Sequence, residues 1–230
     1  MPNTATTNAI FLLAAAIGAS TAPAAGAAEP IPCQPERWAD AIAKFQKEDE
    51  AAPPPKQGIL FVGSSSIRGW DLKKWFPDLP AINRGFGGSQ LCDSTHYADA
   101  LITKHQPRVI VVYAGDNDIS AGKSPEQVHA DFRALVAKIR TSLPETPIVF
   151  ISIKPSLARW KLAEEMKAAN RLIAADCEKE KNLKFVDVWE AMLGADGQPR
   201  AELLRDDRLH LTDAGYELWT ELLRPAIVEE

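Results

Sequence analysis

The sequence predicts an α/β protein built on a parallel β-sheet whose two faces are covered by helices. Short runs of apolar and β-branched residues alternate along the chain with longer segments in which apolar residues recur every three or four positions. The short runs are apolar at both odd and even positions, as in strands that are buried on both faces. Strands that alternate with helices are joined by right-handed crossovers, and this arrangement places the strands parallel.

The candidate strands are short and rich in Val, Ile, Leu and Phe, and the second of them is the weakest. They span residues 58–62, 81–83, 108–113, 147–153 and 184–188. We therefore expect a sheet of about five strands.

One helical segment precedes the strands, and others lie between them. A polar helix is expected at 35–50, where the proline run 53–55 ends it, and a second helix at 91–105. The helix at 124–141 starts with Ser-Pro-Glu-Gln, which is a capping box with proline at the first helical position. A further helix at 158–181 places apolar residues on one face.

The last helix has a predicted start at Thr212. The threonine is a suitable N-cap, and Leu211 and Tyr216 are placed for a hydrophobic staple across it.

Residues 1–28 resemble a signal peptide rather than part of the fold. They contain no Asp, Glu, Lys or Arg, and residues 9–19 are an apolar stretch of the length of an h-region. Small residues fit a cleavage after Ala28, with a cleavage after Ala27 as the second choice. We expect an exported protein, periplasmic or secreted, with a single domain at 29–230.

The first part of that domain, residues 29–56, is expected to be the N-terminal helix with a proline-rich linker. The composition is that of a globular domain, with 46% hydrophobic and 25% charged residues. The net charge of -5 makes nucleic acid an unfavourable partner. No apolar run approaches the ~18 residues of a membrane span. The oligomeric state is left open.

Three cysteines, Cys33, Cys92 and Cys177, cannot all pair within one chain. Cys177 continues the apolar face of a predicted helix, which favours a buried free thiol. One disulfide is possible in an oxidising compartment, and the sequence leaves open which cysteines form it. No two cysteines have the spacing of zinc ligands.

Three small polar loops follow the first three strands, at 63–66, 84–88 and 114–118. In an open parallel sheet, ligands bind beyond the carboxyl ends of the strands. We therefore expect these loops to meet at one edge of the sheet.

A hydroxyl nucleophile in such a loop needs a base, which is usually histidine. His96, His105 and His129 fall in or near predicted helices and are expected at the surface or at its boundary. His210 differs, because Asp207 lies three residues before it in a turn. That spacing allows the carboxylate to bond imidazole Nδ1 and leaves Nε2 to take a proton from serine.

Each loop also has a simpler interpretation when it is taken alone. The serine triplet 64–66 could be a plain turn or an anion-binding nest, although no Gly-Lys-Ser/Thr of a phosphate loop follows it. Residues 116–118 could be a turn or half of a calcium loop, but the EF-hand spacing is missing.

In sequence order, the segments FVGSSSI, NRGFGGSQ, YAGDND and DDRLH resemble the four blocks of the SGNH/GDSL hydrolase family. The resemblance implies a nucleophile, a base with its orienting carboxylate, and donors for an oxyanion. These are Ser65, His210 and Asp207, with Ser65, Gly88 and Asn117 as the oxyanion donors. Ser64 stands where the first block has Asp, which leaves the register within the serine triplet open, with Ser65 favoured.

The resemblance also implies a three-layer α/β/α sandwich with a flavodoxin-like sheet, and hydrolysis of carboxylic esters without a metal or an organic cofactor. The loops between the blocks are short, which favours a shallow site for short-chain acyl or acetyl esters. Four aromatic residues could line this site or simply pack in the core. They are Trp70, Trp75, Phe86 and Trp160.

Two other classes of function compete with the esterase. One is a non-catalytic carbohydrate-binding module on the same fold. The other is a thiol hydrolase that uses Cys92 with His96, four residues apart on a helix, although helical cysteines more often serve packing.

Overall fold

The computed structural model describes Met1 and residues 33–228. Apart from Met1, the predicted signal peptide and its cleavage site lie outside the described residues. Export and the single-domain boundary at residue 29 therefore remain predictions.

The core of the molecule is a five-stranded, all-parallel sheet with the order β2-β1-β3-β4-β5. The predicted strands are confirmed within a few residues. Their bounds are Ile59–Gly63 (β1), Ala81–Gly85 (β2), Val109–Tyr113 (β3), Ile148–Ile151 (β4) and Leu183–Val186 (β5). From β1 the chain first moves to one side, to β2, and then crosses back to β3. The carboxyl ends of β1 and β3 therefore flank the point where the winding direction reverses, which is where open sheets bind ligands.

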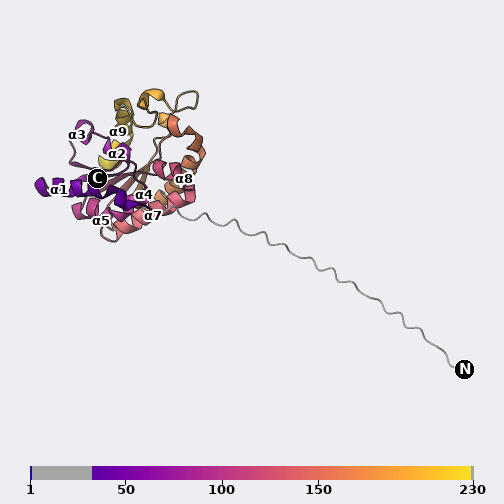
Figure 1. The fold of residues 1–230 in the computed structure, drawn as a ribbon, viewed down its shortest axis with the longest axis horizontal. Coiled ribbons are helices and arrows are strands. Elements are labelled where there is room, and N and C mark those ends of the chain that lie inside the picture. The colour runs from indigo at the N-terminus through magenta and orange to yellow at the C-terminus, as the bar shows by residue number, and fades with distance from the viewer. Residues whose placement is uncertain (2–32, 229–230) are drawn as a thin grey trace.

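Two helical layers cover the sheet and confirm the three-layer α/β/α architecture (Figure 1). Alternate strand residues face opposite layers, so that Leu60 and Val62 join one hydrophobic core while Ile59 and Phe61 join the other. The first layer contains α1 (Ala39–Ala51), α4 (Leu91–His96), α5 (Ala98–Leu101), α7 (Pro125–Arg140) and α8 (Ala163–Cys177). The second contains α2 (Ser65–Arg68), α3 (Leu72–Trp75) and α9 (Asp213–Val228).

Shorter helical turns complete the described chain. They are α6 (Asp116–Ser120), η1 (Pro35–Trp38), η2 (Thr103–His105), η3 (Leu157–Leu162), η4 (Glu190–Met192) and η5 (Ala201–Leu203). No helix among residues 33–228 is both long enough and apolar enough to cross a bilayer.

The predicted helix starts are confirmed by their hydrogen bonds. Ser124 Oγ accepts the N–H of Gln127 at 3.3 Å, and Gln127 Oε1 accepts the N–H of Ser124 at 2.9 Å. Thr212 Oγ1 accepts the N–H of Gly215 at 3.3 Å, as expected for the cap of α9.

Two predicted helices are shorter than expected because tertiary contacts interrupt them. The segment 91–105 is divided into α4, α5 and η2, with a break at Tyr97, whose hydroxyl donates to the carbonyl of Pro35 at 2.9 Å. The segment 158–181 is regular only over α8. It opens as the 3₁₀ turn η3, in which Arg159 has a non-helical backbone (φ -120°, ψ 20°).

Candidate active site

The turn after β1 places one serine at the carboxyl edge of the sheet. Gly63 has φ +134°, and a Cβ at this position would lie 1.9 Å from the carbonyl oxygen of Tyr113, so only glycine fits. The chain therefore passes directly from β1 into α2. Ser64 and Ser66 are buried within this turn, at 0% and 2% exposed, whereas Ser65 is half-buried and reaches the surface.

Ser65, His210 and Asp207 form a chain of hydrogen bonds at this edge. His210 Nε2 lies 3.0 Å from Ser65 Oγ, and His210 Nδ1 lies 2.6 Å from Asp207 Oδ2. The pKa of Asp207 lies well below its usual range. The hydrogen bond from His210 is the largest cause, and the two backbone N–H donors come next. The carboxylate is therefore ionised at neutral pH and can fix the proton on Nδ1.

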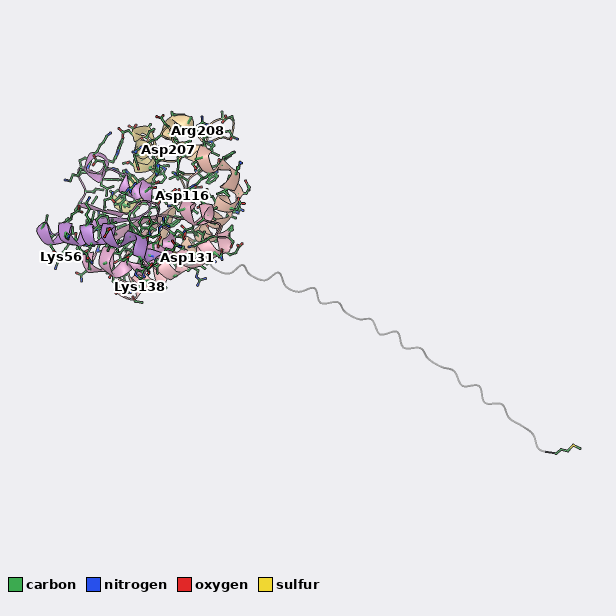
Figure 2. The ribbon with its side chains drawn as sticks, in the orientation of Figure 1. Lys56, Asp116, Asp131, Lys138, Asp207 and Arg208 are labelled. Carbon is green, nitrogen blue, oxygen red and sulfur yellow. A yellow bond between two sulfur atoms is a disulfide. The ribbon has the colours of Figure 1, made fainter. Side chains whose placement is uncertain are left out.

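A tight turn holds Asp207 and His210 in register with each other. Asp207 Oδ1 accepts the backbone N–H groups of Leu209 and His210, both at 2.9 Å. Arg208 between them takes a left-handed backbone (φ 56°), and its carbonyl accepts the N–H of Ala158 at 3.1 Å. Asp207 and Arg208 lie at the rim of the folded part, and Asp116 lies nearer its centre (Figure 2).

Gly88 lies in the loop after β2, which is hydrogen-bonded back to the turn after β1. The N–H of Phe86 donates to the carbonyl of Gly63 at 2.9 Å. Gly88 has φ +81°, and a Cβ at this position would lie 3.2 Å from the ring of Trp38. The disulfide Cys33–Cys92 joins the chain just before η1 to α4, with its Cα atoms 6.0 Å apart.

Asn117 joins the third loop to the second. It lies in α6, whose N-cap Gly115 is two residues after the end of β3. Its Nδ2 donates to the carbonyl of Ser89 at 3.0 Å, and its Oδ1 accepts Arg159 Nη2 at 2.9 Å. The three loops that the sequence placed at one edge are thus linked to one another by hydrogen bonds.

The sequence analysis missed a charged cluster beneath Asn117. Asp116 Oδ2 lies 2.9 Å from Arg159 Nη1 and 3.5 Å from Lys154 Nζ. Lys154 is 1% exposed, and this burial lowers its pKa. The only sequence signal was a pair of basic residues after the fourth strand, at the same edge as the other loops.

A second buried ion pair supports the third loop from behind. Asp118 is fully buried and accepts the N–H of Leu91 at 3.2 Å and Lys123 Nζ at 3.1 Å. Burial raises the pKa of Asp118 to about 6, although Lys123 opposes this rise. The contact with Leu91 fixes the start of α4 against α6.

Two of the four aromatic residues that could line the site or pack in the core are found in the core. Trp70 and Phe86 are 2% and 1% exposed. Trp70 packs against Phe61 and Trp219, because the apolar face of α9 closes over it. Trp75 and Trp160 are half-buried at the margins of the two cores.

The other histidines lie away from the hydrogen-bond chain around Ser65. His105 is 8% exposed rather than at the surface, because Asp49 and Lys104 fold over it with Arg84. His129 is half-buried and pairs with Asp176 at 2.6 Å, and His96 is exposed.

The thiol-hydrolase alternative is wrong, because Cys92 is bonded to Cys33 and offers no thiolate. Among the described residues, the side chains close enough together to share a metal ion are those of Cys33, Cys92 and Asp93, and both of these sulfurs are used in the disulfide. Cys177 is a free, buried thiol, as expected.

Comparison with known proteins identifies the family of the chain. The sequence model of the GDSL-like Lipase/Acylhydrolase family matches residues 62–218. None of the curated proteins compared with the chain matches it.

Several solved structures share the fold. A candidate platelet activating factor from Streptococcus pneumonia superposes with a TM-score of 0.74 at 22% identity, over 83% of this chain and 93% of that one. A GDSL-like lipase from Bacteroides thetaiotaomicron gives 0.67 at 19% identity, over 81% and 96%. A catalytic mutant of an acetylxylan esterase from Geobacillus stearothermophilus gives 0.61 at 18% identity, over 76% and 97%. At these identities the likeness shows the fold, whereas the sequence match spans most of the chain. The chain therefore belongs to the GDSL-like Lipase/Acylhydrolase family, a family of hydrolases that act on acyl esters.

Proposed function

We propose that the chain is a serine esterase in which Ser65 is the nucleophile, His210 the general base and Asp207 the residue that orients the base. The hydrogen-bond chain from Ser65 through His210 to Asp207 is the observation on which this proposal rests. It has the order and spacing that activation of a serine hydroxyl requires.

In the proposed reaction, Ser65 Oγ attacks the ester carbonyl while His210 Nε2 takes the hydroxyl proton. The ionised Asp207 balances the charge of the imidazolium that forms. His210 then protonates the leaving alcohol, and the acyl group stays on Ser65. Water, activated by His210, attacks the acyl-enzyme and releases the acid.

The negative oxygen of the tetrahedral intermediate needs donors that are already in place. We assign this role to the backbone N–H groups of Ser65 and Gly88 and to the side-chain amide of Asn117. Each donor of this kind lowers the barrier by about 3 kcal/mol.

Short-chain acyl or acetyl esters are the substrates we propose. The turns after β1 and β3 pass directly into helices, which supports an open site without a lid over Ser65. The acetylxylan esterase with the same fold is consistent with an acetyl group.

We also propose that the protein is exported after cleavage near Ala28. The disulfide Cys33–Cys92 supports an oxidising compartment. The N-terminal sequence of the protein recovered outside the cytoplasm of an expressing bacterium tests the cleavage site.

The experiment that tests the activity is hydrolysis of p-nitrophenyl acetate, butyrate and octanoate by residues 29–230. Ser65→Ala should lose at least about 10⁴-fold in kcat. Ser64→Ala is the matched control, because its buried hydroxyl has no hydrogen-bond partner among the described residues, and it should keep nearly full activity. Equal activity of Ser65→Ala and the wild type would refute the assigned nucleophile. No turnover of any ester by the wild type would favour the carbohydrate-binding module.

A further inference from the structure

Arg159 makes an unusual pair of contacts with two consecutive residues of the third loop. Its Nη2 donates to Asn117 Oδ1 at 2.9 Å, and its Nη1 lies 2.9 Å from Asp116 Oδ2. The Nη2 contact is a hydrogen bond, whereas Nη1 pairs with the Asp116 carboxylate through charge, so one planar guanidinium engages both residues at once. The Arg159 side chain is 17% exposed, which keeps it largely shielded from water.

These contacts determine which way the Asn117 carboxamide points. Arginine has only donors, so the atom that faces it must be the oxygen of the amide. The carbonyl of Ser89 has only acceptors, so the atom that faces it at 3.0 Å must be the amide nitrogen. One of the two N–H bonds of Asn117 Nδ2 is used on Ser89. The other is the donor that the proposed oxyanion site requires.

The charge of Arg159 is balanced where it lies. Asp116 faces both Arg159 and Lys154, and all three belong to the cluster beneath Asn117. The ion pair with Asp116 therefore holds the guanidinium against Asn117 in a site that is mostly closed to water.

The backbone of the same segment is fixed independently of the Arg159 side chain. The N–H of Ala158 donates to the carbonyl of Arg208, between Asp207 and His210. The N–H of Arg159 itself donates to the carbonyl of Ser156 at 3.3 Å. A change of the Arg159 side chain alone leaves these backbone contacts available.

We propose that Arg159 is a positioning residue for ester hydrolysis, which holds the Asn117 carboxamide by its oxygen so that an amide N–H faces the oxyanion. This inference rests on the proposed esterase function and adds to it a residue outside the four sequence blocks. The competing role is direct binding of an acidic group of the substrate by the guanidinium.

A double-mutant cycle separates these roles. Arg159→Met should lower kcat for p-nitrophenyl acetate by about 10- to 100-fold, which is below the 10²–10³-fold cost of removing an oxyanion donor outright. KM should change by less than about threefold, because the contact matters only once the oxyanion forms. In an Asn117→Ala background, Arg159→Met should have less than about a threefold further effect.

The control variants test charge and local structure. Lys161→Met removes a positive charge from the same turn at an exposed position and should change kcat by less than about twofold. Arg159→Lys keeps the charge opposite Asp116 but loses the fork, so its kcat should fall between those of the wild type and Arg159→Met. If Arg159→Met fails to fold, Arg159→Lys replaces it in the cycle. Its loss of kcat should then disappear in the Asn117→Ala background.

Several outcomes would overturn the inference. An equal loss from the Arg159 variant with and without Asn117 would show that Arg159 acts on the substrate or elsewhere. Full activity of Asn117→Ala would refute the proposed oxyanion donor itself, and an inactive wild type would refute the esterase function.

If the wild type is inactive, a crystal structure of Arg159→Met tests by itself whether Arg159 positions Asn117. An Asn117 carboxamide displaced by about 1 Å or rotated supports the inference, because a shift of this size is costly in an active site, and an unchanged one contradicts it.

Discussion

Replacing Asp207 by asparagine tests the proposed triad while preserving the shape of its turn. Asp207 Oδ1 accepts two backbone N–H groups, and Oδ2 contacts His210 Nδ1 at 2.6 Å. In Asp207→Asn the amide oxygen can keep both backbone bonds, so its NH₂ group faces Nδ1. Nδ1 must then accept, and the imidazole proton moves to Nε2. His210 can no longer take the proton of Ser65, and kcat should fall by about 10³- to 10⁴-fold.

The stability of the variant should change little. The Asp207 side chain is 48% exposed, and exposed pairs contribute about 1 kcal/mol or less. We therefore expect kcat for p-nitrophenyl acetate to fall while the midpoint of urea unfolding stays near that of the wild type. Asp206→Asn, the neighbouring exposed carboxylate, should retain full activity. A loss below about tenfold in Asp207→Asn would refute the role of Asp207 in setting the tautomer.

Two further predictions concern stability. The disulfide closes a separation of 59 residues, so Cys33→Ser with Cys92→Ser should lower the free energy of unfolding in urea by about 2–4 kcal/mol; an unchanged midpoint would show that the bond adds nothing to the fold. Burial, with Arg84 nearby, lowers the pKa of His105 from 6.5 to about 4, so between these values the unfolded chain binds a proton that the folded chain does not. The free energy of unfolding therefore receives the full contribution of neutral His105 above pH 6.5. It falls by at most about 3 kcal/mol as the pH is lowered to 4. His105→Gln should flatten this part of the urea-unfolding profile between pH 7.5 and 4.5, and an identical slope in both proteins would contradict the explanation.

Local sequence patterns determined much of the architecture. Five apolar runs marked the five strands, because residues buried on both faces of a sheet must be apolar at consecutive positions. The capping box at Ser124 and the cap at Thr212 could be predicted from the sequence because each depends on residues within one helical turn. The pairing of Asp207 with His210 was predictable for the same reason, since three residues in a turn already limit the distance between them.

The placement of Ser65 also followed from short-range information. Gly63 permits the sharp exit from β1, and parallel strands bring their carboxyl ends to one edge. The structure brings Ser65 to His210 across 145 positions, as the four sequence blocks suggested. The catalytic roles of these residues remain our proposal.

Apart from the meeting of Ser65 with His210, only the tertiary structure decided which distant side chains meet. The pairing of Cys33 with Cys92, the burial of Trp70 under α9 and the interruption of the helix at Tyr97 all depend on contacts between separate elements. Periodicity reports how one element is buried, and it has no information on which partner covers it.

The cluster beneath Asn117 shows this limit most clearly. Lysine and arginine are usually exposed, so nothing in the local sequence indicates that Lys154 is buried or that Arg159 turns inward. Both are placed by Asp116 in α6, which follows another strand of the sheet, because a buried carboxylate needs cationic partners. The sequence by itself determined the sheet, the helix caps and the loops that meet at its edge. The packing of those loops decided how Asn117 is held, since that depends on a residue 42 positions away in the chain.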